Sequence, residues 1–153
     1  MKLPLRIGVG IVLLNNKNEI FVAKRIDNPK NFWQMPQGGV DNKEKYLKAA
    51  LRELKEETSI TSVELIKEID EWYTYELPEY LLGKIWKGKF RGQKQKWFLM
   101  RYFGNDDEIN IKTKKPEFLD WKWIDIDSIT ETVVDFKRHV YMELKEKVIK
   151  IIN

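Results

Sequence analysis

The sequence contains no cysteine and only one histidine, His139. The absence of cysteine excludes disulfide bonds, zinc–thiolate sites and a cysteine nucleophile. A single histidine also excludes a metal centre that is built from several histidine ligands. Any metal ion bound by this chain must therefore have oxygen ligands, which are the ligands that Mg²⁺, Mn²⁺ and Ca²⁺ prefer.

Long apolar runs are also missing. No stretch approaches the ~18 consecutive apolar residues that cross a bilayer, and no cleavage site typical of a signal peptide follows the apolar residues near the amino terminus. We therefore expect a cytoplasmic protein that does not bind membranes. The sequence gives no reason to infer an obligate protein partner.

Apolar residues are nevertheless plentiful in this chain. Hydrophobic residues make up 42% and aromatic residues 12% of its 153 positions, which is more than a disordered chain carries. Neither an internal repeat nor a proline- or serine-rich linker divides the sequence. We expect residues 1–153 to fold as a single domain with its own hydrophobic core.

The charges are unevenly distributed. The net charge is +4, yet six of the 28 basic residues lie between Lys84 and Lys96, a segment without any acidic residue. Trp86 and Phe90 are interleaved with these cations. One interpretation is a flexible, solvated loop; the one that we favour is a basic face, formed by unpaired cations, that binds the phosphates of a polyanionic ligand.

The pattern of apolar residues predicts both strands and helices. Short apolar or alternating runs predict strands, and the turn residues between the first two indicate a hairpin. The segment 35–39, which contains proline and two glycines, is expected to be a tight loop. The predicted class is α/β (α+β), with strands and helices in layers. The expected strands are 7–14, 19–24, 63–75, 97–104 and 118–124, and the expected helices are 42–58 and 137–152.

The expected helix 42–58 has a defined start and a defined apolar face. Asp41 with Glu44 three residues later forms a capping-box pattern, which predicts that the helix begins there. Apolar residues recur at helical spacing and predict the buried face. Its members are Leu47, Ala50, Leu51 and Leu54.

Three glutamates, Glu53, Glu56 and Glu57, share a different face of this helix. Like charges at this spacing cost about 0.2–0.5 kcal/mol per pair, and acidic residues in the last turn oppose the helix dipole by about 0.3–1 kcal/mol each. A solvated acidic face is one explanation, because solvent screens such repulsion. Since the triplet follows a glycine-containing segment, we favour a cluster of oxygen ligands that holds one or more divalent ions.

The segment around these glutamates resembles the Nudix box, Gly-x₅-Glu-x₇-Arg-Glu-U-x-Glu-Glu-x-Gly-U, in which U is a large aliphatic residue. Eight of the nine specified positions agree in this chain, which reads Gly38-x₅-Glu44-x₇-Arg52-Glu53-Leu54-x-Glu56-Glu57-x-Ser59-Ile60. Ser59 replaces a glycine at the helix exit, where glycine takes a left-handed conformation easily. We expect this departure to lower stability slightly and to leave activity unchanged.

Segments outside the box are similar to those of RNA pyrophosphohydrolases, a Nudix subgroup that overlaps the dinucleoside polyphosphate hydrolases. They lie at 33–39, 92–97, 116–123 and 136–138, and the resemblance covers about residues 7–141. It implies a Nudix-type α/β/α sandwich with a mixed β-sheet. It also implies Mg²⁺ as the cofactor, with Mn²⁺ as a substitute.

The resemblance further implies roles for individual residues. Glu53, Glu56 and Glu57 would ligate Mg²⁺, and the backbone of Gly38 would complete the ligand shell. Glu117 would be a further ligand or a base. Two residues, Glu44 and Arg52, would orient the helix and its carboxylates. The expected substrate contacts are Arg25, Lys87, Lys89, Arg91, Gln95, Phe136 and Lys137.

The implied reaction is hydrolysis of a phosphoanhydride. The leading hypothesis is removal of pyrophosphate from 5′-triphosphorylated RNA, which leaves a 5′-monophosphate. One alternative keeps the chemistry and changes the substrate to a dinucleoside polyphosphate such as diadenosine tetraphosphate. A second alternative is a catalytically silent RNA-binding module, although the intact glutamate triplet argues against it. The sequence does not rank RNA against dinucleotides, because both present bases and a polyphosphate.

Overall fold

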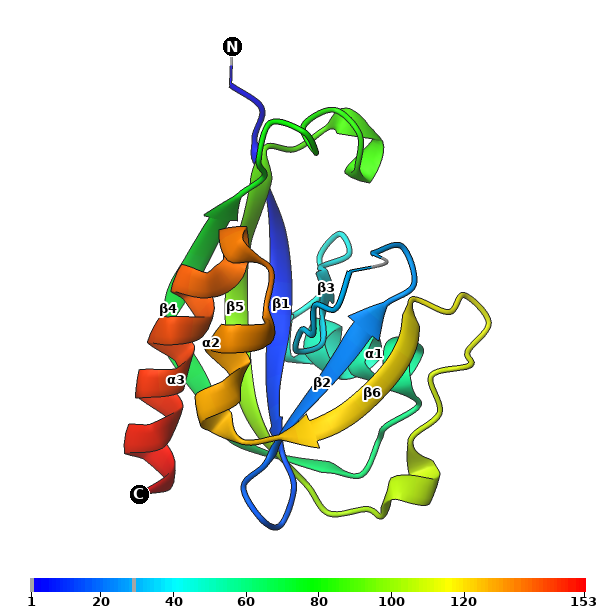
Figure 1. The fold of residues 1–153 in the computed structure, drawn as a ribbon, viewed down its shortest axis with the longest axis vertical. Coiled ribbons are helices and arrows are strands. Elements are labelled where there is room, and N and C mark those ends of the chain that lie inside the picture. Colours follow the sequence, from blue (N-terminus) through cyan, green and yellow to red (C-terminus); the bar gives the residue numbers. More distant parts are fainter. Residues whose placement is uncertain (1, 29) are drawn as a thin grey trace.

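The computed structural model describes residues 2–28 and 30–153 of the chain (Figure 1). Its centre is a mixed sheet with the strand order β4-β5-β1-β2-β6, and a short strand, β3, also pairs with β1. The pairing of β1 with β5 is parallel, and the other strand pairs are antiparallel. The strands are β1 (Leu5–Leu14), β2 (Ile20–Arg25), β3 (Gln37–Gly39), β4 (Val63–Glu76), β5 (Gly92–Tyr102) and β6 (Phe118–Ile124).

Helices cover both faces of this sheet, with α1 behind it and α2 and α3 in front (Figure 1). Their bounds are Tyr46–Thr58 for α1, Ile129–Thr132 for α2 and Arg138–Ile152 for α3. Short 3₁₀ turns occupy Trp86–Gly88, Asp106–Glu108, Ile126–Ser128 and Asp135–Lys137. The predicted α/β/α arrangement with a mixed sheet is therefore confirmed. Within the described part of the chain, no helix is both long and apolar enough to cross a membrane.

Alternate side chains of the central strands supply two separate cores. On β1, Val9, Ile11 and Leu13 face α1, whereas Val12 and Leu14 face α2 and α3. The core on the α1 side also contains Ala50, Leu54, Phe98 and Met100. The core on the other side also contains Trp97, Leu99, Val140, Tyr141, Leu144 and Val148. Both faces of the sheet are therefore covered by helices, so a functional site has to lie at the ends of the strands.

The predicted loop at 35–39 is partly wrong, because Gln37–Gly39 forms β3. Gly8 pairs with Gly39, and Gly10 pairs with Gln37. A Cβ atom on Gly8 would lie only 2.8 Å from the carbonyl oxygen of Gly38, so the two backbones can approach this closely only because β1 has glycine there. A strand of three residues has too little side-chain pattern to be recognised in the sequence.

The start of β5 also differs from the prediction. The strand begins at Gly92 rather than at residue 97, so that Lys94 and Lys96 belong to a strand and not to a loop. Gln93 and Gln95 are buried on either side of the exposed Lys94, and Lys96 is also buried, at 7% exposure. Because the buried side chains are amides, the apolar alternation that identifies a strand is missing at this end.

Helix α1 starts later than the capping box predicts. Its first residue is Tyr46, and no side chain caps it. The Asp41 N–H still donates to Glu44 Oε1 at 3.0 Å, so the pattern forms a turn ahead of the helix. Leu51, expected in the core, is 40% exposed. Ser59 ends the helix in the left-handed conformation, with φ of 67°, and its hydroxyl donates to Asn110 O at 2.9 Å.

Candidate active site

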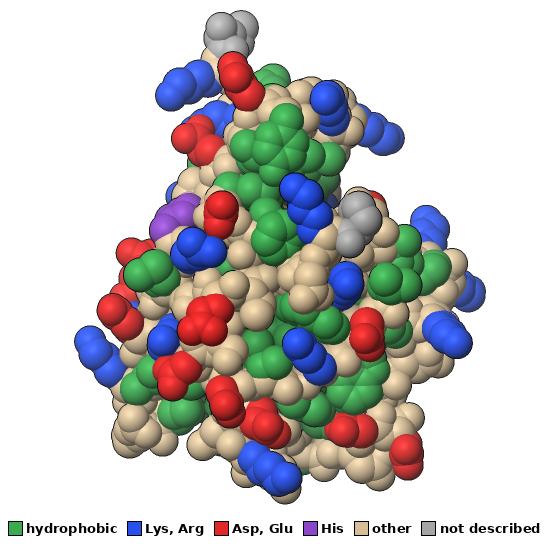
Figure 2. Space-filling view, in the orientation of Figure 1, with side chains coloured by type: hydrophobic (Ala, Val, Ile, Leu, Met, Phe, Trp, Pro, Cys, Tyr) green, Lys and Arg blue, Asp and Glu red, His purple; other side chains and the backbone are tan. Residues whose placement is uncertain are grey.

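A cleft with a volume of about 770 Å³ opens between β3, the loop after β4, and the segment that precedes α3. Basic and aromatic side chains both line it. Figure 2 shows hydrophobic side chains gathered on the upper part of this face, with basic side chains beside them. The cations of the lining are Arg6, Arg25, Lys30 and Lys137, the acidic residues are Asp27, Glu53 and Glu117, and the aromatic residues include Tyr75, Tyr80, Trp86 and Phe136.

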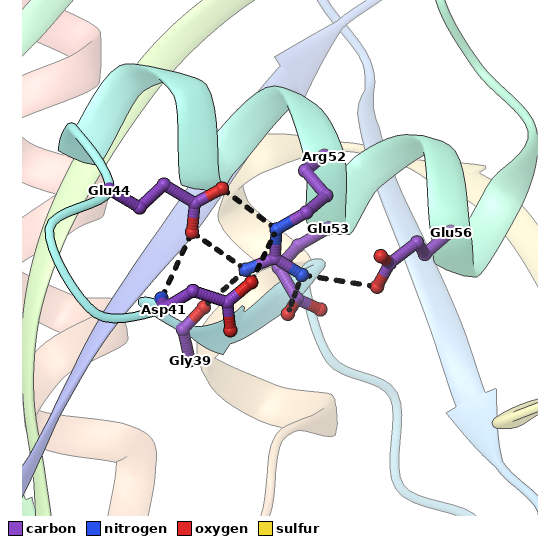
Figure 3. Close-up of polar contacts among 6 residues, drawn as sticks. All are labelled: Gly39, Asp41, Glu44, Arg52, Glu53 and Glu56. Atoms are coloured by element: carbon purple, nitrogen blue, oxygen red, sulfur yellow. Dashed lines mark hydrogen bonds and ion pairs between the residues drawn. The ribbon is translucent and has the colours of Figure 1, made fainter.

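Arg52 connects the start of α1 to its glutamates (Figure 3). Its guanidinium donates to both carboxylate oxygens of Glu44, at 2.8 and 2.9 Å, and to the carbonyl oxygen of Gly39 at 2.9 Å. It also donates to Glu53 Oε1 at 2.9 Å and to Glu56 Oε2 at 3.2 Å. The guanidinium that binds Glu44 in the turn before the helix therefore also binds Glu53 and Glu56 on the helix.

Glu53 lies directly against the backbone of β3. A Cβ atom on Gly38 would fall 2.1 Å from the carboxylate carbon of Glu53, so only glycine leaves room for this side chain. Burial raises the pKa of Glu53 to about 7 even though Arg52 favours the charged form. The carboxylates of Glu56 and Glu117 add to this rise by repulsion.

Glu57 is more deeply buried than Glu53 or Glu56, at 3% exposure. Burial raises the pKa of its carboxyl group well above the ordinary value, and the nearby charges of Glu117 and Glu53 raise it further. Its Oε2 atom has no hydrogen-bond partner. A buried oxygen without a partner is rare, because such a group loses the hydrogen bonds that it makes with water.

The carboxylates of Glu53, Glu56 and Glu57 do not converge on one point. Glu56 turns toward Arg52, and 58% of its side chain is exposed. In residues 2–28 and 30–153, no three His, Cys, Asp or Glu side chains are grouped so that they could already hold a metal ion. The residues nevertheless fit a divalent cation, because they supply oxygen ligands and because Glu57 has an unpartnered oxygen that such an ion would satisfy.

Arg25 and Lys137, two of the expected substrate contacts, lie in the cleft. Arg25 forms an ion pair with Asp27 through two contacts of 2.8 Å. The ammonium group of Lys137 is buried and lies 3.4 Å from Gln34 Oε1. Burial, with some help from the charge of Arg25, lowers the pKa of Lys137 to about 7. An anionic ligand beside Lys137 would favour its charged form.

Arg6 and Lys30 also line the cleft, although no pattern in the sequence selects them. Arg6 lies over Gly39, where a Cβ atom would be 2.2 Å from a guanidinium nitrogen. Its guanidinium carbon is also 5.3 Å from the centre of the Trp86 ring. Arg6 could be selected from the sequence only if β3 were known, because the pairing of β3 with β1 places Gly39 against Arg6.

The segment from Lys84 to Lys96 differs in part from the expected face of unpaired cations. Lys87, Lys89 and Arg91 are not among the residues that line the cleft. The expectation that these cations lack partners is wrong for Arg91, which pairs with Glu76 on β4 at 2.9 Å. It is also wrong for Lys96, whose ammonium donates to the backbone oxygen of Asp70 at 2.7 Å.

The remaining expected contacts differ in their access to the cleft. Phe136 lines it and lies 5.7 Å from Tyr75, measured between ring centres. Gln95 is only 1% exposed and bonds to other side chains of the protein. Glu117 also lines the cleft, and the segment before β6 brings it close to Glu57. The structure therefore brings Glu53, Glu117 and the cleft-lining cations together and keeps Gln95 beneath them.

The raised carboxyl pKa values predict an unusual pH dependence of stability. In the metal-free protein Glu53 and Glu57 keep protons that the unfolded chain releases near pH 4.5, so the free energy of unfolding should fall as pH rises from about 4.5 to 7. Replacing Glu57 by Gln should remove part of this fall and stabilise the metal-free protein at pH 8 by about 1–3 kcal/mol. Urea unfolding at pH 5, 7 and 8 measures both effects, and an unfolding free energy that rises between pH 5 and pH 7 would contradict the assignment.

Comparisons with known proteins agree over nearly the whole chain. A family profile described as the NUDIX domain matches residues 4–144. An RNA pyrophosphohydrolase of Pelagibacter ubique (strain HTCC1062) is 69% identical over 153 residues, which cover 100% of this chain and 97% of that relative. The RNA pyrophosphohydrolase of Orientia tsutsugamushi (strain Boryong) is 48% identical over 139 residues, which cover 91% of this chain and 86% of that relative.

Solved structures share the fold at lower sequence identity. The Escherichia coli dihydroneopterin triphosphate pyrophosphohydrolase has a TM-score of 0.73 and 20% identity, and the match covers 94% of this chain and 99% of that one. A Caenorhabditis elegans Ap4A hydrolase, in a binary complex, has a TM-score of 0.65 and 19% identity, with 94% and 98% covered. At these identities the likeness concerns the arrangement of strands and helices.

Proposed function

Because this chain belongs to the Nudix family, whose hydrolases generally use divalent metal ions, we propose that it is a Mg²⁺-dependent RNA 5′-pyrophosphohydrolase acting in the cytoplasm. It would release pyrophosphate from 5′-triphosphorylated RNA and leave a 5′-monophosphate. The observation that carries this proposal is the partnerless oxygen of buried Glu57, which lies beside a cleft lined by cations. Relatives that are 69% and 48% identical and are named RNA pyrophosphohydrolases support the choice of substrate.

The ligands of Mg²⁺ would be Glu53, Glu56 and Glu57, with the backbone of Gly38 and with Glu117 as a further ligand or base. Mn²⁺ would substitute for Mg²⁺, because both ions prefer oxygen ligands. When bound, the metal neutralises charge on the phosphates and makes a bound water more acidic. A carboxylate that is left free by the metal, such as Glu117, would accept the proton of the attacking water.

The cations of the cleft would hold the triphosphate. Arg6, Arg25 and Lys137 come from three different elements and line one cavity, so a phosphate chain can contact all of them together. Their fixed positive charges would stabilise the negative charge that spreads over the phosphoryl oxygens during the reaction. Phe136 would stack on a base next to the triphosphate, since its ring lines the same cavity.

The direct test compares two substrates. We expect the protein to release pyrophosphate from triphosphorylated RNA with a higher kcat/KM than it shows on diadenosine tetraphosphate. Phe136→Ala should lower kcat/KM on the RNA by about ten-fold, because stacking of a base is worth about 1–3 kcal/mol, whereas Phe136→Trp should retain most of it. A preference for the dinucleotide would favour the alternative hydrolase, and RNA binding without hydrolysis would indicate a silent module.

Lys87, Lys89 and Arg91 lie outside the cleft and would contact phosphates further along the RNA. The double variant Lys87→Ala/Lys89→Ala should then reduce the slope of log K against log salt by about 1.4, since each phosphate contact to a single strand contributes about 0.7. RNA titrations at several salt concentrations measure this slope. The matched control Lys17→Ala/Lys150→Ala removes one charge from the hairpin between β1 and β2 and one from the last turn of α3, and should leave the slope unchanged. Both elements end on the side of the molecule opposite the loop that follows β4 (Figure 1). Equal slopes in the two double variants would contradict the role of the basic segment.

A further inference from the structure

A chain of side-chain hydrogen bonds lies beneath the cleft and links β5 to β3. The indole N–H of Trp97 donates to Gln95 Oε1 at 3.0 Å. The Gln95 amide nitrogen donates to Gln37 Oε1 at 3.1 Å and to Gln93 Oε1 at 2.6 Å. The Gln37 amide nitrogen donates to the hydroxyl of Tyr75 at 3.3 Å, and that hydroxyl donates to Gln93 Oε1 at 3.3 Å.

The direction of this chain is fixed at its buried end. An indole nitrogen can only donate, so the atom of Gln95 that faces Trp97 must be the amide oxygen. The amide nitrogen of Gln95 must then face Gln37, and the amide oxygen of Gln37 must accept its hydrogen bond. The amide nitrogen of Gln37 is therefore left at the cleft side, where one of its hydrogens binds Tyr75 and the other has no acceptor among the residues that the structure describes. A glutamine on its own could present either end to a ligand.

We propose that this hydrogen-bond relay makes Gln37 a substrate-binding residue, which donates to a phosphate oxygen of the substrate, and makes Gln95 and Trp97 positioning residues that act through it. The inference rests on the proposed function and adds residues to the same site. Gln95 and Trp97, at 1% and 0% exposure, are too deeply buried to touch a ligand. Gln37 lines the cleft, and Gln95 does not.

The neighbours of Gln37 indicate a phosphate rather than a base as its ligand. Gly38, the next residue, packs against the carboxylate of Glu53, and Gly39 lies beneath the guanidinium of Arg6. Gln37 and Gly39 share one face of β3, so the Gln37 side chain projects on the side of Arg6, and both residues line the cleft together with Glu53, where the phosphate chain would pass. Phosphate oxygens only accept hydrogen bonds, so an amide oxygen in this place would repel them.

The variant Gln95→Glu tests the direction of the relay without changing the shape of the side chain. Its carboxylate can still accept from Trp97, but it cannot donate to Gln37, so Gln37 must turn its amide and present its oxygen to the cleft. We expect the Kd for inorganic tripolyphosphate, measured by calorimetry at pH 8, to rise by about ten-fold or more. The KM for triphosphorylated RNA should rise in parallel, and kcat should change less.

A pH series separates the relay from simple packing. When a buried Glu at position 95 binds a proton, its hydroxyl can donate to Gln37 as the amide did, so the ratio of variant to parent affinity should recover as pH falls. Arg6 and Arg25, which act on Tyr75, stay positive over this range, and Lys137, whose Nζ lies 5.3 Å from the centre of the Tyr75 ring, titrates in the parent and the variant alike, so its effect cancels in the ratio. Gln95→Met, which cannot donate at any pH, should show a loss that does not change with pH. A Gln95→Glu loss that is equally independent of pH would overturn the relay.

Gln37→Leu provides a second variant in case a charge at position 95 prevents folding. It removes the donor at the rim of the cleft and should weaken tripolyphosphate binding by about ten-fold. Binding at the parental affinity in this variant would also overturn the proposal. Because tripolyphosphate binding requires no RNA hydrolysis, a parent protein that binds tripolyphosphate but releases no pyrophosphate from RNA would contradict the proposed function and would still test the relay.

Discussion

Replacing Glu56 by Gln is expected to lower kcat on triphosphorylated RNA by about 100-fold or more while the protein remains folded. The substitution removes one negative charge from the proposed metal ligands, and the loss of such a ligand weakens every step that depends on the ion. The fold should tolerate it, because 58% of the Glu56 side chain is exposed and its contact with Arg52 at 3.2 Å is a surface ion pair. Such pairs contribute about 0–1 kcal/mol to stability.

The measurement is single-turnover hydrolysis over a range of Mg²⁺ concentrations, together with urea unfolding of the same preparations. Glu146→Gln is the matched control, because it removes the same charge from an exposed position on α3. This control should retain the parental rate. If the Glu56 variant hydrolyses RNA at the parental rate in Mg²⁺, the assignment of Glu56 as a metal ligand is wrong.

The glutamate face of α1 could be predicted from the sequence because helical geometry alone places residues three and four apart on one side. The burial of Glu57 and the turn of Glu56 toward Arg52 could not. The turn of Glu56 depends on Arg52, which also binds Glu44 eight residues earlier and a backbone oxygen of β3. The burial of Glu57 depends on the fold around it, which brings Glu117 from the segment before β6 close to it. The capping-box bond from Asp41 to Glu44 forms, but Lys43 between them has a left-handed φ of 63°, so these residues make a turn and α1 begins only at Tyr46.

The phosphate-binding side of the site was harder to predict. Counting charges along the chain selected the segment between Lys84 and Lys96, but the acidic partner of Arg91 comes from β4, where Glu76 lies across the sheet. Arg6 stands alone in the sequence and becomes a cleft residue only because β3 pairs with β1. Contacts between strands that are distant in sequence leave no local pattern, so they appear only in the folded protein.

Arg52→Lys is the second change from which we expect a large effect. The guanidinium of Arg52 donates hydrogen bonds to the carbonyl oxygen of Gly39 and to three carboxylates, those of Glu44, Glu53 and Glu56. A lysine keeps the positive charge but has one compact ammonium group. It lacks the planar fork of N–H donors with which Arg52 reaches all these acceptors. Glu53 and Glu56 would lose the contacts that hold them near the cleft. Residues that orient metal ligands typically contribute 10–100-fold to metal affinity or activity.

We therefore expect Arg52→Lys to raise the Mg²⁺ concentration needed for half-maximal activity by about ten-fold or more. A Mg²⁺ titration of the hydrolysis rate measures this, and Mn²⁺ binding by calorimetry provides a readout without substrate. Arg101→Lys is the control, since Arg101 is bound to backbone and side-chain oxygens of the hairpin between β1 and β2, away from the cleft. Unchanged metal affinity with lowered stability would mean that Arg52 only anchors the start of α1. Weakened affinity with unchanged stability would show that its contacts with Glu53 and Glu56 position the metal ligands.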